Sequence, residues 1–119
     1  MQTVILDTNA LLMPFEIRIN IDLEIMKLVG DARIIVPGPL VGELKHLKHK
    51  YAKAAIQLAR KYEIYQTEAS GDEAVIEAAL RTEGYVLTND KELRSKLRAL
   101  GISMIYLRSS THLILEEVK

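Results

Sequence analysis

The chain alternates short, continuous apolar runs with longer segments in which apolar residues recur every three or four positions. The first pattern is typical of buried strands and the second of amphipathic helices. The expected strands cover residues 3–6, 33–37, 63–67, 85–88, 102–107 and 112–116. The third of them, EIYQT, is expected to be a short edge strand.

Helices are expected between these strands. Apolar spacing predicts them over residues 21–29, 40–47, 51–62, 71–83 and 93–100. A glycine follows the first, fourth and fifth of these segments, where it stops the helix. The stretch after the first strand is expected to be short, helical or irregular, and to end near Pro14. Ser70 and Glu73 have the spacing of a capping box at the start of the fourth helix.

Strands that alternate with helices imply a mainly parallel sheet covered by helices on both faces. We therefore expect an α/β protein, a three-layer α/β/α sandwich with a central, mainly parallel sheet, formed by one domain over residues 1–119. In such sheets a functional site lies at the carboxyl ends of the strands, near the point where the strand order reverses.

Composition narrows the class of protein. Apolar residues make up 49% of the chain and charged residues 27%, as in globular rather than disordered proteins. No apolar run approaches the roughly 18 residues of a membrane span, and no cationic segment precedes the first apolar run. A cytoplasmic location is therefore expected. The absence of cysteine from the sequence excludes disulfides, zinc–thiolate sites and a cysteine nucleophile.

Charge is unevenly distributed, although the formal net charge is zero. Residues 44–61 contain no acid and include six cations, which are Lys45, Lys48, Lys50, Lys53, Arg60 and Lys61. A second group with one acid among them, Glu92, consists of Lys91, Arg94, Lys96 and Arg98. Each group can be a solvated helix face, but an unbroken run of one sign favours a track for phosphate groups.

Two strands end in nearly the same polar triplet. Residues 7–9 (DTN) follow the first strand, and residues 88–90 (TND) end the strand that begins at residue 85. Thr and Asn beside Asp are common in caps and turns, but that explanation does not account for the near-repeat. Because the carboxyl ends of parallel strands meet at one edge of a sheet, Asp7 and Asp90 are expected to be neighbours.

Two further acids have positions of interest. Asp72 lies in the first turn of a helix, and its neighbours at i+3 and i+4 are Val75 and Ile76, so it faces the apolar side. Glu43 lies at the edge of an apolar stripe within a helix. Acids in first turns also complement the helix dipole, which is a sufficient structural explanation for Asp72 and Asp90 taken singly. It does not explain Glu43 or Asp7.

Electrostatics indicates what would hold these acids together. Two carboxylates about 5 Å apart repel each other by roughly 3 kcal/mol at an effective dielectric constant near 20. Protonation relieves part of this repulsion, and a divalent cation relieves more of it at neutral pH. Oxygen ligands without cysteine or a paired histidine favour Mg²⁺ or Mn²⁺ over zinc. One or two such ions beside a basic track are suited to hydrolysis of phosphodiesters by an activated water.

The motifs LDTN, VGEL, SGDEAVIEAA and VLTNDKELR occur in this order, and the chain resembles PIN domains, a family of metal-dependent nucleases, from Val4 to about Leu115. The strand ending MIYLR fits the same resemblance. The segment from Gly42 to the Asp72 motif is similar to the branch of PIN endonucleases that process precursor ribosomal RNA. VapC-type toxins have a similar size and the same order of acids.

The resemblance implies an active endoribonuclease with a PIN-like fold. It implies that the metal-binding carboxylates are Asp7, Glu43, Asp72 and Asp90, and that Asn9 and Thr88 orient Asp7, a water on the metal or the scissile phosphate. Asn89 is expected to shape the turn. The expected RNA-binding cations are Lys45, Lys48, Lys50, Lys53, Lys91 and Arg94. Such domains often form homodimers, and the apolar and tyrosine-rich segments 21–28 and 51–62 are the expected contact regions.

Two other phosphate-handling α/β folds fit the residues less well. A haloacid-dehalogenase-type phosphatase needs a second Asp two residues after the first, where this chain has Asn9. A response-regulator receiver needs an Asp near the middle of the chain, where residues 48–62 contain none. Two alternatives stay open, and each implies a protein partner. One is a toxin held inactive by an antitoxin, and the other is a non-catalytic RNA-binding module in ribosome assembly.

Overall fold

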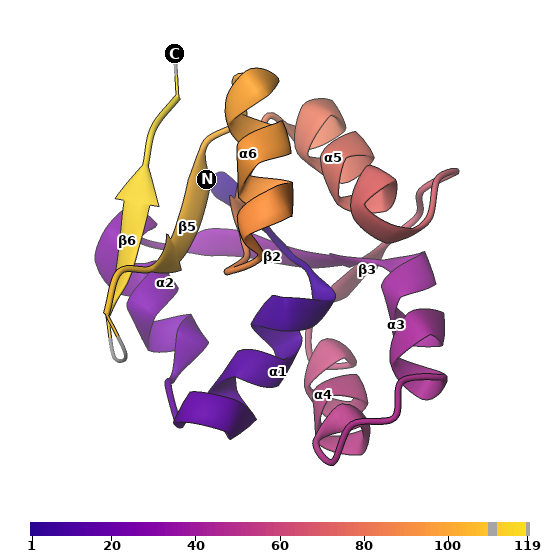
Figure 1. Cartoon of the computed structure of the whole chain (residues 1–119). Coiled ribbons are helices and arrows are strands. Elements are labelled where there is room, and N and C mark those ends of the chain that lie inside the picture. Colours follow the sequence, from indigo (N-terminus) through magenta and orange to yellow (C-terminus); the bar gives the residue numbers. More distant parts are fainter. Residues whose placement is uncertain (110–111, 119) are drawn as a thin grey trace.

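The computed structural model describes residues 1–109 and 112–118 and contains a six-stranded sheet that crosses the molecule (Figure 1). Its strands are β1 (Gln2–Leu6), β2 (Ala32–Pro37), β3 (Glu63–Tyr65), β4 (Tyr85–Leu87), β5 (Met104–Leu107) and β6 (Leu113–Glu116). They lie in the order β3-β2-β1-β4-β5-β6. All neighbours pair in parallel except β5 and β6, which are antiparallel. The segment EIYQT supplies β3 at one edge, as the sequence predicted.

Helices cover both faces of the sheet. Within the described residues they are α1 (Thr8–Ile17), α2 (Ile21–Val29), α3 (Gly38–Lys45), α4 (Ala52–Ala59), α5 (Gly71–Thr82) and α6 (Lys91–Ala99). Figure 1 shows α5 and α6 on one side of the sheet and α1, α2 and α4 on the other. The predicted three-layer α/β/α architecture with a mainly parallel sheet is therefore confirmed. None of the helices in the described residues combines the length and apolar character needed to cross a membrane.

Three helices end at other residues than predicted, and one of them, α4, ends at Ala59 and not at residue 62. The segment after β1 does not end near Pro14, because α1 continues through that residue to Ile17. A proline inside a helix removes one hydrogen bond and crowds the carbonyl four positions earlier, but the buried run Ala10–Met13 holds the helix against the core. Helix α3 ends at Lys45, before the predicted end at Leu47, whose side chain is 40% exposed.

The strand order reverses at the centre of the sheet, beside β1. The chain leaves β1 toward β2 and β3, and α5 then carries it back to β4 on the other side of β1. Val4, Ile5 and Leu6 of this central strand are fully buried, since helices cover both faces. Leu6 pairs with Leu87 at the last rung of the β1–β4 ladder. The residues that follow these two leucines therefore emerge at the same level of one sheet edge.

The chain passes close to β1 at Gly84, just before β4 begins. A substitution of Gly84 tests how closely the two segments pack. A Cβ atom at Gly84 would lie 2.7 Å from the carbonyl oxygen of Thr3 and 2.9 Å from Oγ1 of Thr82. Gly84→Ala is therefore expected to lower the free energy of unfolding by about 1–3 kcal/mol, as overpacking does. Urea titrations measure the change. The matched control is Gly42→Ala in α3, where a Cβ has no neighbour within 4 Å and helix propensity predicts a gain of about 0.5–1 kcal/mol. Equal losses in the two variants would contradict the crowding.

Candidate active site

The two polar triplets interlock at the carboxyl edge of the central strands. The hydroxyl of Thr88 donates a short hydrogen bond to Oδ2 of Asp7. The backbone N–H of Asn89 donates to Oδ1 of Asn9 at 2.8 Å. Because Leu6 and Leu87 are paired, each triplet meets the other directly across the ladder. This pairing of the two turns accounts for the near-repeat in the sequence.

Asp7 is a buried acid that also begins a helix. Its Oδ1 accepts the backbone N–H of Ala10 at 2.7 Å, so the carboxylate is the N-cap of α1. The residue is only 6% exposed. The pKa of Asp7 is raised to about 7, mainly by burial; the hydrogen bonds from Thr88 and Ala10 lower it, and the charges of Asp90 and Asp72 add to the rise. The folded protein therefore holds a carboxyl group that is only partly ionised near neutral pH.

Asp90 is tied to the same turn through Thr88. The backbone N–H of Asp90 donates to Oγ1 of Thr88 at 3.1 Å. The side chain of Asp90 is the N-cap of α6, since its Oδ1 accepts the N–H of Leu93 at 2.9 Å. Thr88 is fully buried, and its hydroxyl connects the two acids. It accepts a hydrogen bond from the backbone N–H of Asp90 and donates one to the carboxylate of Asp7. The position of Asp90 relative to Asp7 thus depends on one hydroxyl group.

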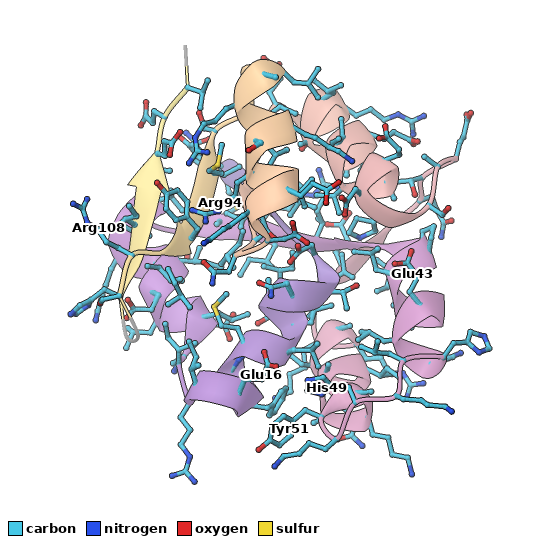
Figure 2. The ribbon with its side chains drawn as sticks, viewed as in Figure 1. Glu16, Glu43, His49, Tyr51, Arg94 and Arg108 are labelled. Carbon is cyan, nitrogen blue, oxygen red and sulfur yellow. The ribbon has the colours of Figure 1, made fainter. Side chains whose placement is uncertain are left out.

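Glu43 and Asp72 come from α3 and α5, which are joined by a hydrogen bond. Oε2 of Glu43, labelled on α3 in Figure 2, accepts the backbone N–H of Gly71 at 2.9 Å. Ser70 is the N-cap residue of α5 but makes no side-chain capping bond, so the predicted capping box with Glu73 is wrong. The carboxylate of Glu43, from α3, binds the first N–H group of the helix, that of Gly71, which a capping box would leave unbound.

The four acids line one cavity. It measures about 340 Å³ and is lined by Asp7, Thr8, Asn9, Leu12, Leu40, Glu43, Leu47, Gly71, Asp72, Val75 and Asp90. Leu47, predicted to belong to an apolar stripe, instead contributes an exposed wall. Within the described residues, no three acid or histidine side chains are already close enough to hold a metal ion. The lining is nevertheless rich in carboxylate oxygen, the donor that hard divalent cations prefer.

The cations divide into two groups with different surroundings. Lys45 ends α3, Lys48 and Lys50 follow it in the loop, and Lys53 lies on α4, all of them exposed. Lys50 also lies over the ring of Tyr51, with Nζ 5.0 Å from its centroid. This group forms the basic surface next to the element that carries Glu43.

The second group is largely engaged within the chain. Lys91 is exposed, whereas Arg94, labelled in Figure 2, is half-buried. The guanidinium of Arg94 lies 4.2 Å from the ring centroid of Tyr106. Among the described residues, the buried Nε of Arg94 has no hydrogen-bond partner. Arg98 binds Glu116 at 2.6 Å. Arg94 and Arg98 are therefore engaged with β5 and β6, whereas Lys91 is exposed.

Lys96 lies beside one of the four acids, a contact that the sequence did not reveal. Its Nζ lies 3.8 Å from Oδ2 of Asp72, and both side chains are more than two-fifths exposed. An ion pair this exposed contributes little stability, but it brings one positive charge to the rim of the cavity. No spacing in the sequence relates Lys96 to Asp72, because the contact joins two different helices.

The chain is similar to one protein family and to two curated ribonucleases over most of its length. The family described as PIN like domain matches residues 4–110. Ribonuclease VapC9 of Archaeoglobus fulgidus is 29% identical over 94% of this chain and 87% of its own length. Ribonuclease VapC4 of Methanocaldococcus jannaschii is 30% identical over 94% of this chain and 95% of its own length.

Solved structures with the same fold are more distant in sequence. The PIN domain endonuclease Utp24 superposes with a TM-score of 0.82 at 20% identity, over 98% of this chain and 92% of that one. A domain of a functionally unknown protein from Methanocaldococcus jannaschii superposes with a TM-score of 0.67 at 22% identity, over 100% of this chain and 97% of that one. At these identities the likeness establishes the fold.

Replacing the buried acid by its amide, Asp7→Asn, is expected to stabilise the metal-free protein at alkaline pH. Folding raises the pKa of Asp7 from 3.8 to about 7. The folded state therefore binds the proton more tightly than the unfolded chain, and the wild-type free energy of unfolding falls as pH rises through this interval. The advantage of the variant should grow by about 2–3 kcal/mol between pH 5 and pH 8. Urea titrations in EDTA at the two pH values measure it.

The control for this prediction is Asp31→Asn, in the turn before β2, where the side chain is exposed. Its stability relative to the wild type should be nearly the same at both pH values. An equal pH response in the two variants would show that burial of Asp7 is not the cause.

Proposed function

Because the chain belongs to the PIN-like domain family, we propose that it is an endoribonuclease that hydrolyses RNA phosphodiester bonds with the help of divalent metal ions. The observation that carries this proposal is the convergence of Asp7, Glu43, Asp72 and Asp90 on one cavity. These acids come from four separate parts of the chain, and a stable protein has no structural need to bring their charges together.

The donor set fits a hard cation. Asp7, Glu43, Asp72 and Asp90 would hold one or two Mg²⁺ or Mn²⁺ ions, since the lining of the cavity contains carboxylates and neither cysteine nor histidine. A bound ion supplies positive charge that polarises the phosphate and lowers the pKa of a water. The raised pKa of Asp7 fits this role, because an uncompensated negative charge is costly in so buried a position.

The residues around Asp7 prepare its carboxylate for binding. The Thr88 hydroxyl and the Ala10 N–H each bind one oxygen of Asp7, which fixes the plane of the carboxylate. Asn9 is held by the N–H of Asn89 at the same edge. Side chains locked in this way lose little freedom when a ligand binds.

The basic residues provide a path for the RNA backbone across the cavity. Lys45, Lys48, Lys50 and Lys53 lie on the side of α3 and α4, and Lys91 and Arg94 lie on the side of α6. Each lysine or arginine that neutralises a phosphate releases counterions, so binding should weaken steeply with salt. Arg94 contributes from a fixed position over Tyr106, whereas the lysines of the first group are exposed.

Two cellular roles are compatible with this activity. Two relatives that are similar over nearly the whole chain are named as VapC ribonucleases, which favours the role of a toxin controlled by an antitoxin partner. A role in ribosomal RNA processing has the support of the sequence motifs. Growth arrest on induction, relieved by the product of a small neighbouring gene, would support the toxin. Accumulation of uncut ribosomal RNA precursors on depletion would support the processing enzyme.

Association of two copies is a further part of the proposal. Leu23 and Met26 on α2 are each 49% exposed, and covering such side chains contributes on the order of 1 kcal/mol each. The segment 51–62 is a weaker contact region, because Tyr62 donates to Asp22 at 2.7 Å within the chain. A solution mass of twice the 13.4 kDa of one chain would agree with pairing, and a mass of one chain at micromolar concentration would contradict it.

Cleavage of RNA in the presence of Mn²⁺ tests the activity. The wild type should cut a structured RNA internally, leaving 5′-phosphate and 3′-hydroxyl ends, and EDTA should abolish the reaction. Asp72→Asn should lower kcat by about 100-fold or more, since even an outer partner of a metal site contributes 10- to 100-fold. Asp72 is the suitable position because its side chain is 43% exposed, so the variant should fold.

Binding measurements separate this enzyme from a non-catalytic RNA-binding module. In EDTA, Lys48→Glu with Lys53→Glu should weaken RNA binding and lower the salt dependence by about two counterions. Lys27→Glu on α2 is the charge control. The absence of cleavage by a wild type that binds RNA normally would favour the module. Full cleavage by Asp72→Asn would contradict the assignment of the activity to this site.

A further inference from the structure

A second, smaller cavity adjoins the acidic one. It measures about 110 Å³ and is lined by Asn9, Met13, Glu16, Ile17, Asn89 and Leu107. Asn9 lines both cavities, so a ligand in the smaller one lies next to whatever binds between the acids. The cavity has room for several water molecules, which suits the edge of one planar ring and not a whole nucleotide.

Two amide groups in this cavity have a fixed orientation. Oδ1 of Asn9 accepts the N–H of Asn89 at 2.8 Å, and Oδ1 of Asn89 accepts the N–H of Leu107 at 3.3 Å. A backbone N–H can only donate, so the oxygen of each amide must face it. Each NH₂ group is thereby turned away from these partners. In the described residues neither NH₂ group has a protein acceptor, which leaves two hydrogen-bond donors for a ligand.

The carboxylate of Glu16 is the acceptor of the same cavity, and His49 holds it in place. Oε2 of Glu16 lies 3.0 Å from Nε2 of His49. Nδ1 of His49 accepts the backbone N–H of Tyr51 at 3.0 Å, so in the neutral ring the proton lies on Nε2 and donates to Glu16. Figure 2 shows Glu16 at the end of α1 beside His49 of the α3–α4 loop. A side chain otherwise free to rotate is thus oriented from a different part of the chain.

We propose that this cavity is a subsite for one unpaired nucleobase beside the scissile phosphate, and that Glu16 makes it selective for guanine. The inference rests on the proposed ribonuclease function, because it specifies the substrate of that same site. Sequence-specific proteins commonly read single-stranded RNA through bases that insert into pockets and pair along their Watson–Crick edge. Met13, Ile17 and Leu107 provide the apolar walls that such a base contacts.

The polar groups match guanine better than the other bases. Its Watson–Crick edge has one acceptor, O6, beside two donors, N1–H and the N2 amino group. The amide NH₂ groups can donate to O6, and the Glu16 carboxylate can accept from both donors. Adenine and cytosine would place a ring nitrogen lone pair against the carboxylate. Uracil offers one N–H between two carbonyl oxygens, so one oxygen would face the negative charge.

The test uses short unpaired RNAs that differ at one base next to the cut. With guanine there, kcat/KM in Mn²⁺ should exceed that of the adenine, cytosine and uracil versions by about 10-fold, as expected for one bidentate base contact. Inosine, which lacks the N2 amino group, should fall in between. Glu16→Ala should reduce the preference to less than about 3-fold, again on the scale of that contact. Glu24→Gln on α2 is the control and should keep the preference.

His49 serves as a positioning residue, and conservative replacement tests that role. In His49→Gln the amide NH₂ can replace the Nε2 donor, so guanine preference should largely remain. His49→Ala removes the donor and should lose the preference, although Glu16 is unchanged. Melting temperatures of both variants report folding separately. If Glu16 and His49 formed only a structural link between α1 and the loop, their loss would lower stability and leave base preference intact, which would overturn the proposal.

Binding of the same RNAs in EDTA, followed by fluorescence anisotropy, separates this inference from the proposed function. Guanine preference in binding without any metal-dependent cleavage would support the subsite and overturn the ribonuclease. Metal-dependent cleavage with equal rates and affinities for all four bases would support the ribonuclease and overturn the subsite. A preference for another base that survives Glu16→Ala would also overturn the assignment to Glu16.

Discussion

The hydrogen bond from Thr88 to the buried carboxylate of Asp7 joins the two central strands at the edge where the four acids meet. It exists because Leu6 and Leu87 are paired, so the residues after them emerge at the same level. Asp90 depends on the same hydroxyl through its backbone N–H. A shift of one residue in the β1–β4 register would turn Thr88 to the other face and separate the acids.

The burial of Asp7 affects the stability of the folded protein. Burial raises the pKa of the Asp7 carboxyl group, and the folded protein becomes less stable once that group ionises. Such positions persist where a ligand supplies the missing charge, and a strained or charged site of this kind is common in active sites. Helices cover both faces of the sheet, and the strands beneath the site are fully buried. The burial of these strands offsets the loss of stability caused by Asp7.

Charge balance in this protein is local. The acids gather at the cavity, and the exposed lysines lie along α3, α4 and the loop between them. On α6 the cations have partners within the chain, such as Tyr106 for Arg94, Glu116 for Arg98 and Asp72 for Lys96. A net charge of zero therefore coexists with an acidic pocket and exposed lysines on neighbouring elements.

The sequence by itself determined the class of fold, the order of the strands along the chain and the identity of the acids after β1 and β4. Periodicity and strand-end motifs are local properties, and parallel strands bring their carboxyl ends together whatever the details of packing. Helix ends were less well predicted at Pro14 and Leu47, where tertiary contacts outweigh local preference.

Only the tertiary structure decided which groups are partners. Glu43 binds the first N–H of α5, Lys96 meets Asp72, and His49 orients Glu16. These contacts join residues 24 to 33 positions apart on different elements. Their geometry follows from how helices pack across a sheet, and no local pattern of residues encodes it.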